Sequence, residues 1–140
     1  MLMFAYGMNT NPTEMAQRCP GAKSWGHARL VNHSFRFAHH ADVEPCEGSF
    51  VEGVLWEIDD EHLKALDALE GYPVYYGRSV AYVKHGARML HALVYRMQPG
   101  HETSPPSRSY YNLVSEGYRA HGIPLDQLEN SLNFSTTVLG

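Results

Sequence analysis

Residues 50–73, FVEGVLWEIDDEHLKALDALEGYP, hold a strand, a helix and the end of that helix in one stretch of chain. From Phe50 to Ile58 apolar and polar residues partly alternate, as a half-buried strand requires. Over Asp59–Glu70 the apolar positions recur at helical spacing instead, at Leu63, Leu66 and Leu69. Gly71 and the proline two residues later end the helix. We therefore expect a helix directly after a buried strand, with one face turned inward.

Similar patterns along the chain predict four more strands, at residues 2–6, 26–38, 78–84 and 89–97. A turn at His85-Gly86 separates the last two. The connection His39–Ser49 carries Pro45 and Gly48 and has no clear period, so we expect a loop there. Strands and helices do not alternate regularly, which favours a mixed sheet or barrel over a doubly wound fold.

Short helices complete the pattern. Asn11 and Pro12 are suited to the N-cap and first position of one helix, and Ser107 is suited to the N-cap of another. Leucines at helical spacing over residues 125–132 predict a terminal helix. No internal repeat is present, and we expect one α+β domain over residues 1–140.

Composition limits the class of ligand. The chain has 140 residues and a formal net charge of -4, so it lacks the basic field that drives binding to nucleic acid. Residues 1–6 have no basic region and only a short apolar run, which argues against a signal peptide or a membrane helix. We expect a cytoplasmic protein that binds a small molecule.

Neither cysteines nor histidines form a metal motif. Cys19 and Cys46 lie far apart and form no CxxC unit, and the nine histidines include no HExxH spacing. We therefore expect no metal site and reduced thiols. A metal-dependent hydrolase that uses some histidines with Asp42 or Glu44 is a minor alternative.

Glu70 is the residue that most clearly points to chemistry. It follows Leu66 by four residues, so a continued helix aims its carboxylate along the buried face. Burial disfavours the charged form and raises the pKa of a carboxyl group, which suits proton transfer near neutral pH. The alternative is that Glu70 turns outward at the helix end or pairs with Arg78. Three tyrosines just after it favour a pocket, because phenols can wall a cavity and bond a polar ligand: Tyr72, Tyr75 and Tyr76.

Five segments in order resemble the γ-glutamylcyclotransferase-like superfamily, which includes the AIG2-like proteins. They are FAYGMN at 4–9, VEGVLWEI at 51–58, LDALEGYP at 66–73, ALVY at 92–95, and the stretch from Tyr110 through Gly122-Ile123-Pro124. The resemblance spans most of the chain. It implies a small mixed β-barrel flanked by short helices.

The resemblance also implies a reaction that needs no cofactor. In this family the α-amino group of a γ-glutamyl compound attacks its own γ-carbonyl, which releases 5-oxoproline and a free amine or amino acid. Glu70 matches the family's essential glutamate and would act as general acid and base. The implied partner is a small γ-glutamyl substrate, and no oligomeric state follows.

The resemblance assigns the substrate contacts to one loop and four tyrosines. Gly7, Met8 and Asn9 would offer backbone N–H groups to the glutamyl carboxylate or the oxyanion. The matching aromatic positions are Tyr6, Tyr76, Tyr95 and Tyr110, with Tyr76 and Tyr110 as hydroxyl donors and Tyr75 as an alternative to Tyr76. Many members carry Ser or Thr where this chain has Met8, so a hydroxyl contact there is lost.

A different class of function fits the same residues. A non-catalytic module could keep the pocket for a small carboxylate or a protein partner. In either case the substrate's other end would meet two variable segments, His39–Ser49 and Gln98–Pro106.

Overall fold

The computed structural model describes residues 1–139, and Gly140 of the expected domain lies outside them. The strands form a closed barrel in the order β1-β3-β2-β4-β5, in which β1 pairs antiparallel with β3 and parallel with β5. Their bounds are Leu2–Ala5 (β1), Lys23–Ala38 (β2), His40–Glu57 (β3), Tyr76–His85 (β4) and Arg88–Met97 (β5). The prediction of a small mixed barrel of the α+β class is confirmed.

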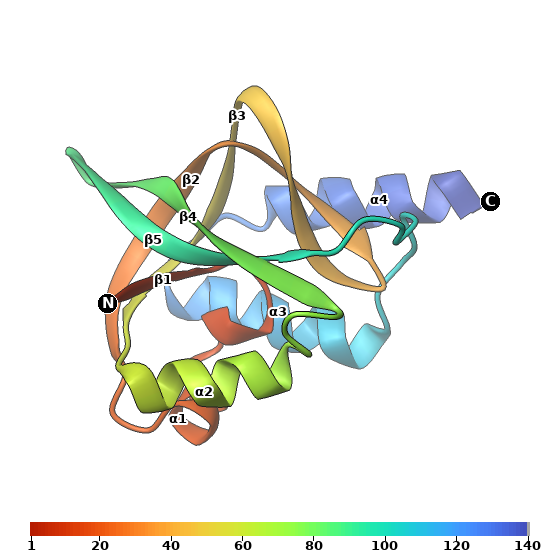
Figure 1. Cartoon of the computed structure of the whole chain (residues 1–140). Coiled ribbons are helices and arrows are strands. Elements are labelled where there is room, and N and C mark those ends of the chain that lie inside the picture. Colours follow the sequence, from red (N-terminus) through yellow and green to blue (C-terminus); the bar gives the residue numbers. More distant parts are fainter. Residues whose placement is uncertain (140) are drawn as a thin grey trace.

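The helices cover the barrel unevenly. In Figure 1, α1, α2 and α3 gather around the loop that leaves β1, whereas α4 lies beside the long β2–β3 hairpin. The helical segments are η1, a 3-10 turn (Met8–Thr10), α1 (Pro12–Arg18), α2 (Asp60–Leu69), α3 (Arg108–Ala120) and α4 (Asp126–Leu139). The expected caps at Asn11 and Ser107 are present, since each side chain accepts a bond from the first turn that follows it.

The segment His39–Ser49 is not the predicted loop. Except for His39, which makes the tight turn with φ 65°, it belongs to β3, and its residues 40–45 pair with β2. Pro45 lies opposite His33, and the four residues after it form a bulge against Asn32, whose side chain accepts a bond from Gly48 N at 3.1 Å. The proline and glycine therefore mark an irregularity inside a strand, because a bulge tolerates a missing N–H and a positive φ.

Two smaller expectations also change. The hairpin turn after β4 falls at Gly86-Ala87, one residue later than predicted. Leu69 is 53% exposed, although its spacing places it on the inward stripe with the fully buried Leu66. The reason is position, because Leu69 lies at the end of α2, where the packed interior gives way to a cavity.

The barrel interior is tightly packed where the end of β1 pairs with β3. A Cβ at Gly53 would lie 2.2 Å from the Ala5 carbonyl oxygen and 2.5 Å from the ring of Phe4, so only glycine allows this approach. The close contact fixes where β1 ends, and with it the position of the loop that follows. None of the helices among residues 1–139 has the length and apolar character needed to cross a membrane.

Candidate active site

A cavity of about 200 Å³ opens at the end of β1. The structure brings all eight residues expected at the site to its wall: Tyr6, Gly7, Met8, Asn9, Glu70, Tyr76, Tyr95 and Tyr110. Tyr75 lines the cavity as well, so both of the alternative tyrosines lie there. The volume suits a ligand of amino-acid size, since drug-sized ligands need more space.

The loop after β1 is held from three directions. Thr10 caps it by donating its backbone N–H and its hydroxyl to the Gly7 carbonyl, at 3.0 and 2.7 Å. The indole of Trp56 donates to the Asn9 carbonyl at 2.9 Å. Helix α3 packs directly on the loop at Gly117, where a Cβ would lie 2.2 Å from Thr10 Oγ1. These contacts anchor the loop at Gly7, Asn9 and Thr10.

Gly7 is the narrowest point of this loop. A Cβ there would come within 3.0 Å of the Ala41 methyl group and 3.1 Å of the Tyr110 hydroxyl. Within residues 1–139, the backbone N–H groups of Gly7, Met8 and Asn9 donate to no protein acceptor. Three consecutive free donors beside a cavity are available to an anion, as in other backbone anion sites.

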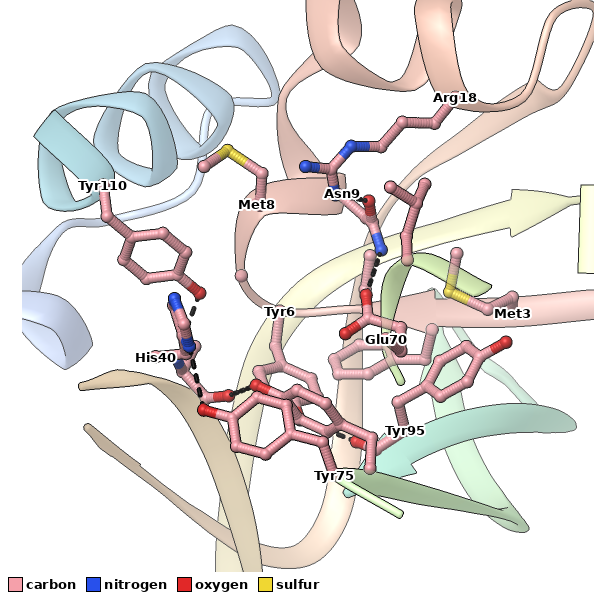
Figure 2. A pocket seen from close by; sticks show the side chains of 16 residues that line it. Met3, Tyr6, Met8, Asn9, Arg18, His40, Glu70, Tyr75, Tyr95 and Tyr110 are labelled. Atoms are coloured by element: carbon pink, nitrogen blue, oxygen red, sulfur yellow. Dashed lines mark hydrogen bonds between the residues drawn. The ribbon is translucent and has the colours of Figure 1, made fainter. Parts of the chain in front are cut away.

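Glu70 closes α2 and faces the same cavity. Its backbone N–H donates to the Leu66 carbonyl at 2.8 Å, so the residue is still bound to the last turn of the helix. One carboxylate oxygen, Oε1, accepts a bond from Asn9 Nδ2 at 3.0 Å. Figure 2 shows the carboxylate between Asn9 above and the aromatic floor of the pocket below. The alternative that Glu70 turns away to solvent is therefore not what the fold adopts.

Burial raises the pKa of Glu70 above its ordinary value. The nearby positive charge of Arg18 and the bond from Asn9 favour the charged form and oppose this rise without cancelling it. The carbonyl end of α2 carries partial negative charge and acts in the same direction as burial. The result is a carboxylate that accepts a proton more readily than a solvent-exposed glutamate.

Tyr76 and Tyr110 both bond the backbone of Ala41 in β3, but at different groups. The Tyr76 hydroxyl donates to the Ala41 carbonyl at 2.6 Å, and Ala41 N donates to the Tyr110 hydroxyl oxygen at 3.0 Å. The Tyr76 proton is thus bound to the barrel. The hydroxyl hydrogen of Tyr110, in contrast, has no acceptor among the described residues. Of the two expected donors, the geometry leaves Tyr110 available to a ligand.

Tyr6 and Tyr95 contribute their rings. The Tyr6 hydroxyl donates to the Tyr95 carbonyl at 2.6 Å, and the Tyr6 carbonyl accepts from the Tyr118 hydroxyl at 2.6 Å. The Tyr95 hydroxyl points away from the cavity (Figure 2) and donates to Asp67 Oδ1 at 2.6 Å. Both phenols therefore serve as walls.

Arg78 pairs with Asp67 and not with Glu70. Its Nε and Nη2 donate to the two Asp67 oxygens at 2.9 and 3.2 Å. This arrangement removes the alternative in which Arg78 neutralises Glu70. It also ties the last turns of α2 to β4, which fixes where Glu70 emerges.

Two cavity residues with polar side chains were missed from the sequence, Arg18 and His40. Arg18 ends α1, and the helix folds back so that its guanidinium reaches Asn9 Oδ1 at 2.8 Å. His40 begins β3, and its Nδ1 lies 2.8 Å from the Tyr75 hydroxyl. Burial and neighbouring His39 lower the pKa of His40, which keeps it neutral. Arg18 has no sequence signal of its own, whereas the adjacent histidine pair was a visible feature inside a segment predicted to be a loop.

Across residues 1–139 no three His, Cys, Asp or Glu side chains lie together in a way that could hold a metal ion. Asp42 and Glu44, the acidic ligands of the hydrolase alternative, both contact Arg36, and Asp42 also accepts a bond from Met97 N at 2.9 Å. The described part of the chain thus offers that alternative no ligand set.

Comparison with known proteins agrees with this geometry. The chain matches the family model described as gamma-glutamyl cyclotransferase, AIG2-like, over residues 3–118. It is 27% identical over 142 residues to the gamma-glutamylcyclotransferase of Homo sapiens, covering 91% of this chain and 75% of that protein. The Bos taurus protein of the same name is also 27% identical, over 139 residues, with 89% and 73% covered.

A solved structure of a gamma-glutamyl cyclotransferase superimposes on this one with a TM-score of 0.83. The two chains are 26% identical, and the superposition covers 94% of this chain and 85% of the other. The family model spans most of the sequence, including the loop after β1, Glu70 and the cavity tyrosines. This chain therefore belongs to the AIG2-like γ-glutamylcyclotransferase family.

Proposed function

We propose that this chain converts a γ-glutamyl compound to 5-oxoproline and a free amine or amino acid, with Glu70 as the group that moves the protons. The observation that carries the proposal is the position of Glu70. Its carboxylate enters a small cavity beside three free backbone N–H groups, with one oxygen held by Asn9 and the other unbonded within the described residues.

The first step is removal of a proton from the substrate's α-ammonium group. A carboxylate whose pKa is raised by burial is a better base than a solvated one. The freed amine then attacks the γ-carbonyl carbon. A carbon–nitrogen bond forms, the five-membered ring closes, and the carbonyl electrons move to oxygen.

The second step breaks the original amide bond. The oxyanion electrons reform the carbonyl, the bond to the leaving nitrogen breaks, and that nitrogen takes the proton held by Glu70. Glu70 then takes the second proton from the ring nitrogen and passes it to the released amine. The products are 5-oxoproline and the amine in its ammonium form, and Glu70 returns to its charged form. Because both reacting groups belong to one molecule, holding the glutamyl chain in a folded conformation supplies much of the rate enhancement.

Two negative charges on the substrate need hydrogen-bond donors during the reaction. The glutamyl α-carboxylate is present throughout, and the oxyanion develops only in the transition state. The N–H groups of Gly7, Met8 and Asn9 are preorganised donors for one of them, since the loop is held by Thr10 and Trp56. The free proton of the Tyr110 hydroxyl supplies a further donor across the cavity.

The test is release of 5-oxoproline from a panel of γ-glutamyl amino acids, γ-glutamyl amines and glutathione. Glu70→Gln is run beside the wild type, because glutamine keeps the shape and the bond to Asn9 but cannot accept the proton. Glu61→Gln is the matched control, because Glu61 is an exposed carboxylate on the same helix and pairs with Lys64. We expect loss of turnover in the first variant and normal turnover in the second.

Two results would count against the proposal in different ways. Near-normal turnover by Glu70→Gln would remove Glu70 from the proton transfers. Thermal stabilisation of the wild type by γ-glutamyl compounds, with no 5-oxoproline formed from any of them, would favour the non-catalytic binding module.

A further inference from the structure

Arg18, Asn9 and Glu70 form a continuous hydrogen-bonded chain from the end of α1 to the end of α2. Arg18 Nη1 donates to Asn9 Oδ1 at 2.8 Å, and Asn9 Nδ2 donates to Glu70 Oε1 at 3.0 Å. Figure 2 shows the three side chains in line, with the guanidinium on the far side of Asn9 from Glu70. The loop backbone of Asn9 is fixed separately by Trp56 at 2.9 Å.

The order of these contacts has a chemical consequence for Asn9. A side-chain amide has an acceptor end and a donor end, and rotation by half a turn exchanges them. Arg18 has only donors, so it selects the orientation in which the Asn9 oxygen faces α1. The donor end must then face Glu70. Without Arg18, the amide is free to turn its oxygen toward Glu70 and accept a bond from the protonated carboxyl group, which would favour the neutral form.

We propose that Arg18 is a positioning residue that acts on Glu70 through Asn9, by keeping the Asn9 amide turned so that it donates to Oε1 and leaves Oε2 to exchange protons with the substrate. The expected effect of Arg18 on turnover rests on the function proposed above. Its expected effect on the titration of Glu70 does not. It assigns different tasks to the two oxygens of Glu70. Within residues 1–139, Oε1 accepts the Asn9 bond and Oε2 accepts none.

The other groups that face Glu70 cannot supply this control. They are His40 from β3 and the phenols of Tyr6, Tyr75, Tyr76, Tyr95 and Tyr110. Burial raises the pKa of every one of these phenols and lowers that of His40, so all remain neutral near neutral pH. Arg18 is thus the positively charged side chain on the cavity wall among the described residues. Its charge and the Asn9 bond both favour the ionised carboxylate, against burial.

The experiment measures the titration of Glu70 directly, by the ¹³C resonance of its side-chain carboxyl in the full-length protein. Two variants change Arg18: Arg18→Met keeps the aliphatic stem, and Arg18→Lys keeps the charge without the planar guanidinium. The others are Asn9→Ala and the double variant that combines Arg18→Met with Asn9→Ala. The control is Glu14→Gln, since Glu14 lies 3.9 Å from Arg18 on the helix surface and outside the cavity wall. Amide spectra verify that each variant is folded.

We expect Arg18→Met to raise the Glu70 midpoint by about one pH unit or more, the effect of losing a nearby opposite charge and a bond to the charged form. Arg18→Lys should restore part of the difference, and Glu14→Gln should change nothing. The effects of Arg18→Met and Asn9→Ala should be less than additive, because both break the same chain. In kinetics, the acid limb of the kcat/KM profile should move upward by the same amount while KM stays nearly constant.

Three outcomes would overturn the proposal. An unchanged Glu70 midpoint in Arg18→Met would show that Arg18 does not act on the carboxylate. Strictly additive shifts would show that its charge acts alone and not through Asn9. A raised KM with an unmoved pH profile would make Arg18 a ligand of the substrate carboxylate instead. If the midpoint shifts as expected but wild type releases no 5-oxoproline, the positioning role stands and the proposed function fails.

Discussion

The side-chain amide of Asn9 donates to the carboxylate of Glu70 at 3.0 Å, across 61 residues of sequence. This bond joins the loop after β1 to the end of α2. It holds the carboxylate of Glu70, the proposed proton-transfer group, at a fixed position relative to the free N–H groups of the loop. Changes that move the loop relative to Glu70 should therefore lower activity.

Glu70 should lower the stability of the protein at neutral pH. Burial raises its pKa in the folded chain, so a stabilising contribution is present below the unfolded pKa and is lost as pH rises through the folded value. Glu70→Gln stays neutral and avoids this loss. We expect the variant to melt at a higher temperature than wild type at pH 8, with the difference shrinking toward pH 4. Equal melting temperatures at both pH values would contradict a raised pKa.

Gly117→Ala should disturb the loop from a distance. The added methyl would lie 2.2 Å from Thr10 Oγ1 and 2.6 Å from Asn11 N, so α3 or the loop must shift. Overpacking of this kind costs about 1–3 kcal/mol, and displacement of the donors should lower kcat as well. Chemical denaturation and 5-oxoproline release measure the two effects. Asn112→Ala, at an exposed position of the same helix, should leave both unchanged.

Tyr76→Phe and Tyr110→Phe should separate stability from ligand binding. The first removes the donor to the buried Ala41 carbonyl, which costs about 1–3 kcal/mol of folding free energy. The second leaves the buried Ala41 N–H without its acceptor, so it costs folding free energy as well, but it also removes the hydroxyl proton that has no acceptor among the described residues. Tyr110→Phe should therefore lower turnover more than Tyr76→Phe does. Denaturation curves and kcat/KM for the same substrate compare them. A larger loss of activity in Tyr76→Phe, at equal stability, would reverse the two roles.

The mouth of the cavity should decide which leaving group is accepted. His40 and Tyr75 line it, and His101 packs edge-on against Tyr75 with ring centroids 5.0 Å apart. His40 belongs to the segment His39–Ser49, His101 belongs to Gln98–Pro106, and Tyr75 lies in the turn before β4. His101→Ala should therefore change the relative kcat/KM values across the substrate panel severalfold. His33→Ala, on β2, is the control. A uniform change for every substrate would argue against a role in selectivity.

Met8→Ser should report on the position where this chain lacks a hydroxyl. Met8 borders the cavity, and Figure 2 shows its side chain between Tyr110 and Asn9. Serine would shorten the side chain and add a donor beside the backbone N–H groups. We expect a changed KM with the backbone contacts intact, measured on the best substrate of the panel. An unchanged KM and unchanged preference would show that the Met8 side chain does not touch the substrate.

Local patterns were sufficient for much of this architecture. The period of the apolar residues located five strands, and capping chemistry located the starts of α1 and α3 at Asn11 and Ser107. The prediction of a loop at His39–Ser49 was wrong because it also used local patterns alone. Pro45 and Gly48 interrupt a regular strand but are acceptable in a bulge. The local sequence does not show whether a partner strand can pair around a bulge.

The sequence by itself determined which chemical groups this protein has to work with: a glutamate at the end of an amphipathic helix, a glycine-containing loop after a buried strand, and tyrosines spread along the chain. Tertiary structure alone decided how they are used. Closing the barrel bound the hydroxyl proton of Tyr76, left that of Tyr110 free, and paired Arg78 with Asp67. It also brought Arg18 to Asn9. The physical reason is that hydrogen bonds depend on distances between residues far apart in sequence, which periodicity and propensity do not specify.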